Sequence, residues 1–197
     1  MYLDANEKCK PNVQSSNTIS KAWSRSGEAR SGEKAEALLN RMESLCKDEK
    51  IDGRPDTVCY NHVIDAYAET GNGQAAERIL TRMYEDYKRG NKHCVPDIWS
   101  FSTVMKAWAR SGDKNSGKHS EAILNHLTKL RNDGTLEIWP HVVFYNSVID
   151  VYAESGDADN AERVFELMVS DYNNGNKECK PDQTSYNTVI KAWAHSG

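Results

Sequence analysis

Apolar residues recur along this chain with the spacing of an α-helix. One set occupies positions i, i+3, i+4 and i+7, so its members share one helix face: Tyr60, Val63, Ile64 and Tyr67. Three later sets repeat it, namely Phe101, Val104, Met105, Trp108; Tyr145, Val148, Ile149, Tyr152; and Tyr186, Val189, Ile190, Trp193. An earlier set has serine at two positions: Ser16, Ile19, Ser20 and Trp23. No useful run alternates apolar and polar residues as a strand would, so the pattern predicts helices alone.

A second amphipathic segment follows each of these helices. Two clear examples carry their own stripes, Ala76, Ile79, Leu80, Met83 and Ala161, Val164, Phe165, Met168. A proline precedes each first helix and cannot extend the helix before it, while a glycine after the helix favours a left-handed stop. A single helical hairpin cannot bury its apolar face, but stacked hairpins can. The chain is therefore predicted to be an all-α solenoid of antiparallel helical hairpins.

The spacing of the repeat alternates between two lengths. The interval from Pro11 to Pro55 equals that from Pro96 to Pro140, and the intervals that follow them, which end at Pro96 and Pro181, are both shorter by three positions. The extra positions of the longer units follow the glycine, where a loop between two helices tolerates them. The full pattern thus recurs with every second repeat.

These landmarks divide the chain into units. We predict full repeats at 13–56, 57–97, 98–141 and 142–182, with partial repeats at 1–12 and 183–197. Tyr2 precedes its proline as Tyr87 and Tyr172 precede theirs, so both chain ends are expected to cut through a repeat.

Charges alternate on the polar face of the first helices. Its middle position carries Lys21, Asp65, Lys106, Asp150 and Lys191 in turn. One helical turn later, the residues are Arg25, Glu69, Arg110, Glu154 and His195. Opposite charges thus face each other at every junction between repeats, with Lys106 expected to pair with Asp65 and Asp150. We predict a ladder of ion pairs, each contributing about 0–1 kcal/mol when exposed.

Composition limits the class of protein. Hydrophobic residues make up 38% of the 197 residues, and the mean hydropathy of −0.76 favours a thin architecture with much surface. The net charge of −4 argues against general attraction to nucleic acid, and no run of about 18 apolar residues predicts a membrane span. The five cysteines form no CxxC pair, which favours reduced thiols over a metal site or disulfides. We expect no cofactor.

The sequence contains no catalytic constellation. His119, Ser120 and Glu121 match the HxE half of a zinc deaminase signature, but the PCxxC half is absent. We expect His119 in the polar loop between two helices, and we expect no enzyme activity from this chain. A catalytic domain beyond either end stays open as an alternative.

Several short motifs resemble the pentatricopeptide repeat family. These are "YNTVI" or "YNSVI" in the first helix, "AE" at the start of the second, a methionine in its middle and the closing "KPD". The resemblance covers essentially the whole chain, although the second helix of each repeat is longer here than in the familiar unit. It implies a right-handed superhelix that binds single-stranded RNA at about one base per repeat. It also implies a role in RNA processing, stability or translation in a mitochondrion or plastid, alongside other RNA-processing proteins and without membrane insertion. A targeting segment would lie upstream of this chain.

The resemblance also implies which side chains contact the bases. Each base would be read by the residue after the first-helix aromatic and by the residue after the next proline. The implied pairs are Asn17 with Asp56, Asn61 with Asp97, Ser102 with His141 and Asn146 with Asp182, followed by Asn187 alone. The residues that would sandwich the bases are Gln14, Val58, Trp99, Val143 and Thr184. The implied read-out is U-U-purine-U-pyrimidine, with the third base open because His141 departs from the usual Asp or Asn.

Three alternatives stay open. The asparagines could be residues that favour a helix start, and the aspartates could be helix caps. The cations Lys21, Arg25, Lys106, Arg110 and Lys191 could contact RNA phosphates instead of forming the ladder. Finally, the solenoid could be a protein-interaction scaffold that does not bind RNA, which the negative net charge and the acidic residues on the polar face favour.

Overall fold

The computed structural model describes residues 18, 21–23, 26, 28–48 and 53–196, and within these ranges the regular structure is entirely helical. The first helices of the repeats are α3 (Thr57–Glu69), α5 (Ile98–Arg110), α7 (Val142–Glu154) and α9 (Gln183–His195). The second helices are α2 (Ser31–Lys47), α4 (Gly73–Lys88), α6 (Ser116–Asn132) and α8 (Ala158–Asn173). A short 3₁₀ helix, η2, covers Lys177–Cys179. The predicted site residues Gln14, Asn17 and Arg25, and the partial repeat at 1–12, lie outside the described residues.

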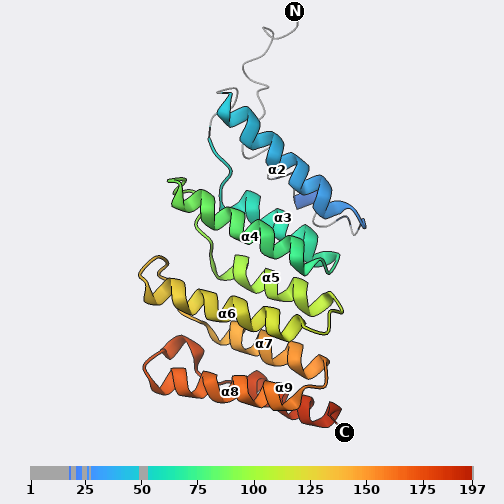
Figure 1. Ribbon diagram of the computed structural model, residues 1–197, viewed down its shortest axis with the longest axis vertical. Coiled ribbons are helices and arrows are strands. Elements are labelled where there is room, and N and C mark those ends of the chain that lie inside the picture. Colours follow the sequence, from blue (N-terminus) through green and yellow to red (C-terminus); the bar gives the residue numbers. More distant parts are fainter. Residues whose placement is uncertain (1–17, 19–20, 24–25, 27, 49–52, 197) are drawn as a thin grey trace, which may run out of the picture.

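The helices form antiparallel hairpins that stack along one axis, with α2 at one end and α9 at the other (Figure 1). The first helices α3, α5 and α7 each pack against their own second helix and against the second helix of the preceding repeat, and α9 packs against α8 of the preceding repeat. The result is a right-handed α-solenoid, as the hydrophobic pattern and the family resemblance predict. The predicted left-handed stops are present, since Gly71, Gly112 and Gly156 follow α3, α5 and α7 with φ of 69°, 68° and 74°.

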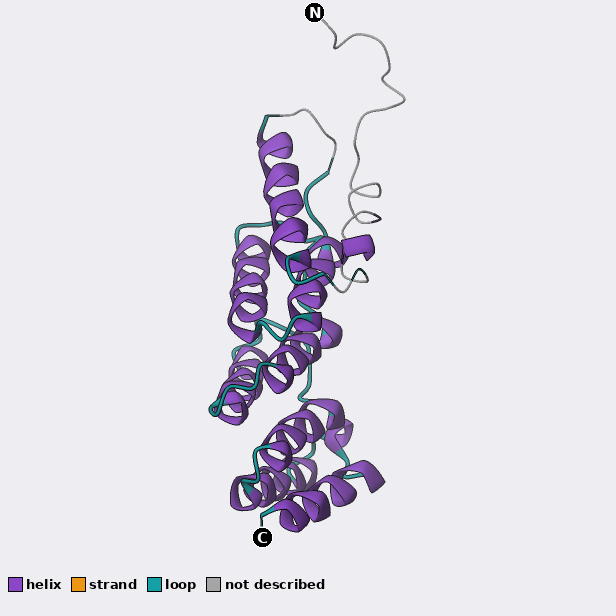
Figure 2. Cartoon of the chain, turned by 90° about the vertical axis from the view of Figure 1, so that its right-hand side faces the viewer, coloured by secondary structure: helices purple, strands orange, loops and turns teal. Residues whose placement is uncertain are grey.

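The two kinds of helix lie in two layers (Figure 2). Consecutive first helices pack directly on one another, from α3 through α5 and α7 to α9. The second helices are spread farther apart, and a cavity of about 540 Å³ separates α4 from α6. Closer spacing in one layer curves the stack toward that layer. The first helices therefore line the concave side, and they carry the residues that the resemblance implies for base contacts.

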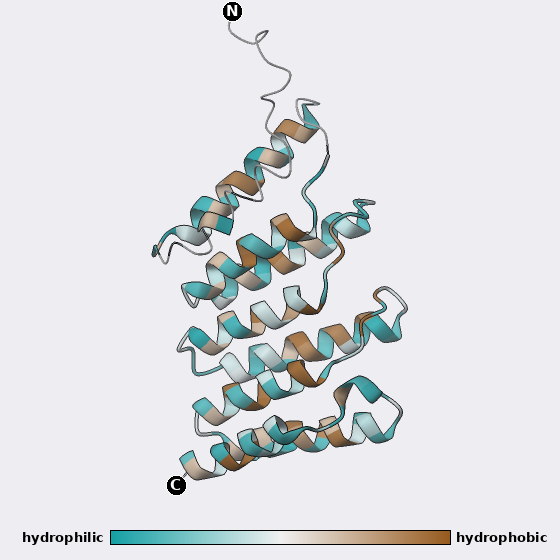
Figure 3. Ribbon diagram, turned by 180° about the vertical axis from the view of Figure 1, so that it is seen from behind, coloured by the Kyte–Doolittle hydropathy of each residue, from teal (hydrophilic) through white to brown (hydrophobic). Residues whose placement is uncertain are grey.

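The predicted apolar stripes form the core. Tyr60, Val63 and Ile64 of α3 are fully buried, and Phe101, Val104 and Met105 of α5 are 0–2% exposed. Apolar and polar residues accordingly alternate around every helix (Figure 3). The stripe of α9, the last helix of the chain, is different: Tyr186 is 55% and Ile190 65% exposed.

The longer repeat places its extra residues partly in a loop and partly in a helix. Five residues, 111–115, join α5 to α6, whereas three join α3 to α4 and α7 to α8. Helix α6 has 17 residues, one more than α4 and α8. The prediction that His119 lies in the loop is therefore wrong, because α6 begins at Ser116. The His119 ring stacks on the indole of Trp108, with centroids 3.9 Å apart and planes 3° from parallel.

Glycines at the start of the second helices make room for aromatic rings of the next repeat. A Cβ atom on Gly73 would lie 2.4 Å from Trp108 Cδ2. Cβ atoms on Gly32 and Gly117 would come as close to the rings of Tyr67 and Tyr152. In each case the neighbour is a rigid ring inside a packed junction. Only glycine, which has no Cβ, therefore fits at these three positions without displacing a ring.

The lengthened ends of the second helices fold back onto the hairpin. Asp86 in α4 accepts hydrogen bonds from Tyr60 Oη at 3.3 Å and from Asn91 Nδ2 at 2.7 Å, and Asn91 Nδ2 also donates to Pro55 O at 2.8 Å. The buried Cys94 thiol lies beside the same carboxylate, 3.5 Å away. An equivalent cluster stands two repeats later, formed by Tyr145, Asp171, Asn176 and Cys179. Burial raises the pKa of both thiols to about 12, so they stay protonated at neutral pH.

Candidate nucleic-acid interface

Two asparagines of the first helices bind aspartates across a junction between repeats. Asn61 Nδ2 in α3 donates to Asp97 Oδ1, at the start of α5, over 3.3 Å. Asn146 Nδ2 in α7 donates to Asp182 Oδ1, at the start of α9, over 3.2 Å. The two pairs occupy equivalent positions in alternate repeats and have nearly the same geometry. The structure thus brings together the members of two of the pairs that the resemblance implies.

The same aspartates also cap helices. Asp56, Asp97 and Asp182 accept hydrogen bonds from the backbone N–H groups of Cys59, Ser100 and Ser185, at 2.8–2.9 Å. The Ser185 N–H, with support from the Asn146 amide, holds the pKa of Asp182 below its usual range, so this carboxylate is ionised at neutral pH. The helix-cap interpretation of the aspartates is correct. It does not compete with pairing, because Asp97 and Asp182 each bind both the helix start and the asparagine.

The two asparagines differ in how far they are enclosed. Asn61 is 8% exposed, and its Oδ1 accepts a hydrogen bond from Ser100 Oγ at 2.6 Å. Asn146 is half-buried, and its buried Oδ1 has no hydrogen-bond partner. An unsatisfied buried carbonyl costs about 1–3 kcal/mol.

The third repeat has no equivalent pair. Ser102 Oγ donates to Trp99 O at 3.2 Å, and no hydrogen bond joins Ser102 to His141, both of which the structure describes. His141 Nδ1 accepts from the Val143 N–H at the start of α7, and its Nε2 lies 3.8 Å from Glu178. In the last partial repeat, Asn187 is exposed on α9.

The residues expected to sandwich bases lie exposed in the first turn of each first helix. Val58 is 47% exposed, Trp99 44% and Val143 44%, and Thr184 is also exposed. Exposed apolar side chains at one repeated position form a row of contact surfaces along the concave layer. Trp99 offers by far the largest face.

Between the described helices α3 to α9, the charge ladder is present at the first and the third junction. At α3–α5, Lys106 Nζ lies 2.6 Å from Glu69 and 3.8 Å from Asp65, while Arg110 binds Glu69 at 2.9 Å. Lys106 and Arg110 thereby hold the pKa of Glu69 below its usual range. At α7–α9, Lys191 Nζ binds Asp150 at 3.0 Å and also Glu154.

The predicted pairing of Lys106 with Asp150 is wrong, since no ion pair joins these two described residues. The reason is the direction in which the lysine side chains extend. Both Lys106 and Lys191 bind the acidic repeat that precedes them, reaching the glutamate one turn beyond the aspartate, so the junction from α5 to α7 lacks this pairing. Lys21 is exposed on the polar face of the first repeat.

The other junctions are joined through the layer of second helices. Arg78 of α4 binds Glu36 of α2 at 2.5 and 2.7 Å, and Tyr67 Oη donates to the same carboxylate. Arg163 of α8 binds Glu121 of α6 at 3.0 and 2.6 Å, joined by Tyr152 Oη at 2.9 Å. The glutamate at this position, which follows Ala35 in one repeat and Ser120 in the other, therefore binds the next repeat. At the junctions from α3 to α9, which the structure describes in both layers, ion pairs alternate between the concave and the outer layer.

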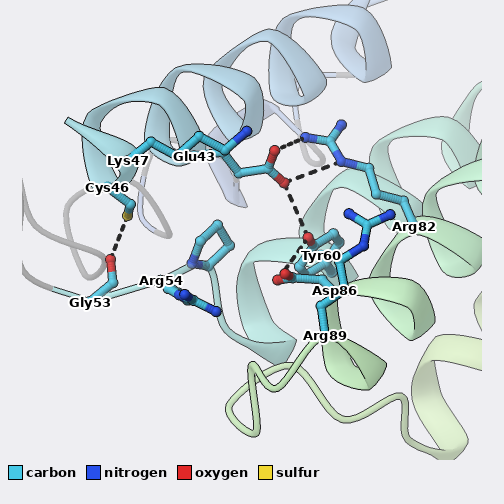
Figure 4. A pocket seen from close by; sticks show the side chains of 10 residues that line it. Glu43, Cys46, Lys47, Gly53, Arg54, Tyr60, Arg82, Asp86 and Arg89 are labelled. Atoms are coloured by element: carbon cyan, nitrogen blue, oxygen red, sulfur yellow. Dashed lines mark hydrogen bonds and ion pairs between the residues drawn. The ribbon is translucent and has the colours of Figure 1, made fainter. Parts of the chain in front are cut away.

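A pocket of about 410 Å³ between α2, α3 and α4 belongs to this outer system (Figure 4). Arg82 binds Glu43 at 2.7 Å, and the Tyr60 hydroxyl lies between Glu43 and Asp86, at 3.2 and 3.3 Å. The Cys46 thiol donates to Gly53 O. Because its polar groups bind one another across the junction, we regard this pocket as an inter-repeat contact.

Charge reversal tests the ladder. Changing Lys191 to Glu should lower the free energy of unfolding by about 1 kcal/mol, because it removes two exposed ion pairs and adds repulsion. Reversing Asp150 and Glu154 to Lys in the same chain should restore most of that loss, as measured by urea denaturation. Purely additive effects would mean that the three charges are not coupled.

Among the residues described, no three His, Cys, Asp or Glu side chains gather as a metal site. No helix in that part of the chain is both long and apolar enough to cross a membrane.

Comparison with known proteins gives consistent matches. Residues 140–195 match the PPR repeat family, and residues 44–111 match the pentatricopeptide repeat domain. One pentatricopeptide repeat-containing protein of Arabidopsis thaliana is 26% identical over 154 residues, covering 78% of this chain and 23% of the relative. A mitochondrial one from the same plant is 30% identical over 108 residues, covering 55% of this chain and 12% of the relative. The chain thus spans less than a quarter of these relatives.

Solved structures support the same fold. The crystal structure of the pentatricopeptide repeat protein PPR10 from maize covers 95% of this chain and 22% of its own, with a TM-score of 0.62 at 22% identity. PPR10 in complex with an 18-nt psaJ RNA element covers 94% of this chain and 23% of its own, with a TM-score of 0.64 at 21% identity. The stacked hairpins, the recurring motifs and these matches agree: the chain belongs to the pentatricopeptide repeat family.

Proposed function

We propose that this chain is a sequence-specific module for single-stranded RNA that reads about one base per repeat along its concave layer. The observation that carries the proposal is the repeated Asn–Asp pair, at 3.3 Å for Asn61 and Asp97 and at 3.2 Å for Asn146 and Asp182. Each aspartate holds the asparagine amide by one N–H and leaves its other N–H for a ligand.

The chemistry of this amide suits a pyrimidine. Asparagine offers both a donor and an acceptor, and the Watson–Crick edge of uracil offers the complementary acceptor and donor. The apolar or indole side chains at 58, 99 and 143 would lie against the base faces, where each stacked base contributes about 1–3 kcal/mol. The proposed read-out is U-U-purine-U-pyrimidine for the units that contain Asn17, Asn61, Ser102, Asn146 and Asn187. The third base is the least defined, because Ser102 and His141 do not bind each other.

Long-range electrostatics would contribute little to this binding. Lys106, Arg110 and Lys191 are each within 3.0 Å of a carboxylate of the preceding repeat. A paired cation releases few counterions when it meets a phosphate, so the salt dependence of affinity should be modest.

The relatives favour the same setting. Several relatives from Arabidopsis thaliana are named as mitochondrial or chloroplastic proteins, and PPR10 has been crystallised with an RNA element. We therefore place this chain in RNA processing, stability or translation in one of these organelles. We assign it no catalytic role.

A protein-interaction scaffold is the competing proposal. It is favoured by the net charge of −4 and by the acidic residues on the concave layer. Those acidic residues are largely neutralised by the ladder, however, and a scaffold does not account for two Asn–Asp pairs of equal geometry.

Binding to U-rich and A-rich single-stranded RNA of equal length tests the proposal. The full chain should prefer the U-rich RNA, and the preference should persist between about 50 and 200 mM salt because it comes from base contacts. Fluorescence anisotropy measures both dissociation constants. Equal affinity for the two RNAs, or affinity that disappears at the higher salt, would favour non-specific attraction or the scaffold.

A further inference from the structure

The two Asn–Asp pairs differ in one hydrogen bond, and the difference comes from the following repeat. Ser100 and Ser185 occupy equivalent positions, the third residue of α5 and of α9, and both are fully buried. Ser100 Oγ lies 2.6 Å from Asn61 Oδ1. Ser185 Oγ binds Asp182 alone, and Asn146 Oδ1 has no partner.

We propose that Ser100 is a positioning residue for base selection: it fixes the orientation of the Asn61 amide and so sharpens the choice of uracil over cytosine. This inference rests on the proposed function, because it assumes that Asn61 faces a base.

The hydrogen bonds around Asn61 specify one amide orientation. The Asp97 carboxylate can only accept, so Asn61 must turn its NH₂ group toward it. Asp97 N–H donates to Ser100 Oγ at 3.1 Å, which leaves the single hydroxyl proton to be donated. Two oxygen acceptors lie within reach, Asn61 Oδ1 at 2.6 Å and Asp97 Oδ1 at 2.8 Å, and the weaker acceptor Met83 Sδ is 3.8 Å away. Asp97 Oδ1 already accepts from Ser100 N–H and from Asn61, so the proton goes to Asn61 Oδ1.

A fixed amide discriminates between the two pyrimidines. Ring atom N3 donates a hydrogen bond in uracil and accepts one in cytosine. When the amide carbonyl is held in place, it meets the uracil donor favourably and opposes the cytosine acceptor. An amide held only at its NH₂ end, as in Asn146, can adjust more readily to either base.

The third repeat supports the assignment to this position. At the junction between the third repeat and α7, the position equivalent to Ser100 is Phe144, the third residue of α7. Its side chain is fully buried and cannot form a hydrogen bond with Ser102. Ser102 Oγ donates instead to Trp99 O within its own helix. The hydroxyl of Ser100 thus supplies a contact that neither of the other described repeats has.

The structural alternative is that Ser100 merely starts a helix. Asp97 and Ser100 form a reciprocal capping box, but so do Asp182 and Ser185. The exchange Ser185→Ala therefore removes the same capping contact without touching an asparagine, and it is the matched control for Ser100→Ala.

The test measures affinity of the full chain for RNAs that carry U or C at the position read by repeat 57–97, and separately at the position read by repeat 142–182. For the wild-type chain, the ratio of the affinity for the U-containing RNA to the affinity for the C-containing RNA (the U:C ratio) should be larger at the first position. S100A should lower that ratio by about 2- to 10-fold, the effect of one hydrogen bond, bringing it near the ratio at the second position. S185A should change neither ratio. The side-chain NH₂ resonances of Asn61 should shift in S100A, while those of Asn146 stay in place in S185A.

The outcomes separate the two proposals. A wild type that prefers U at the first position, with an S100A ratio that is unchanged, overturns the positioning role alone, as does an equal effect of S185A at its own position. A wild type with no preference at either position overturns base reading, and the positioning role with it. An Asn61 resonance that is unmoved in S100A shows that the hydrogen bond does not form in solution, which also overturns the inference.

Discussion

Replacing Asn61 by serine is expected to weaken binding of RNA that carries uracil at the position read by repeat 57–97, by about 1–3 kcal/mol. The exchange removes an amide that donates and accepts and leaves one hydroxyl. Since the shorter side chain leaves room for a larger base, affinity for guanine at that position should rise relative to uracil. Competition binding with four RNAs that differ only at this position measures the change.

Asn146→Ser is the matched control, because it should change the preference at the position read by repeat 142–182 and nowhere else. The fold should persist in both variants. In N61S the Ser100 hydroxyl retains Asp97 Oδ1 as an acceptor at 2.8 Å. An equal loss for all four bases would mean that Asn61 supports the helix junction and does not read RNA.

The exchange Gly73→Ala should lower the free energy of unfolding by about 1–3 kcal/mol, the usual cost of overpacking a junction. The new Cβ would lie 2.4 Å from Trp108 Cδ2 and 2.6 Å from Cε3. The indole cannot easily retreat, because Glu77 accepts its Nε1–H at 3.0 Å and His119 stacks on its face. Chemical denaturation followed by circular dichroism measures the loss.

A second exchange at the ring identifies the cause of that loss. If the clash with Trp108 is responsible, Gly73→Ala should cost much less in a chain that already carries Trp108→Leu. Equal costs in the two backgrounds would place the effect in the backbone of α4 instead. Helix α8 already has alanine, Ala158, as its first residue, so alanine itself is compatible with this helix start.

The helices were predictable because they depend on local rules. The stripe that begins at Tyr60 has the helical period, Pro55 and Gly71 delimit the helix, and the structure places α3 between them. The pairing of Asn61 with Asp97 followed from the resemblance, since no spacing rule joins two residues so far apart in the chain. The position of the polar face was also predictable, because burying the apolar stripe of a first helix leaves the remaining, polar side of that helix exposed.

Side-chain direction was the part that the sequence could not supply. Lys106 has acidic residues on both sides, Asp65 before it and Asp150 after it, and nothing in the sequence favoured one over the other. The hydrogen bond of Ser100 and the stacking of His119 on Trp108 likewise depend on rotamers and on where α5 and α6 meet. One signal was visible: Arg78 and Arg163 follow the "AE" pairs of alternate repeats, with the same two-repeat spacing as the ladder.

The alternation of ion pairs between the two layers restricts how such an array can grow or shrink. Loss of one repeat, such as 98–141, would bring Asp65 and Glu69 against Asp150 and Glu154, acid facing acid. Loss of two, 98–182, would bring the same acidic pair against Lys191 and preserve the match. Duplication follows the same rule, so adding or removing a pair of repeats preserves the charge match. A designer who lengthens this solenoid should therefore add repeats two at a time.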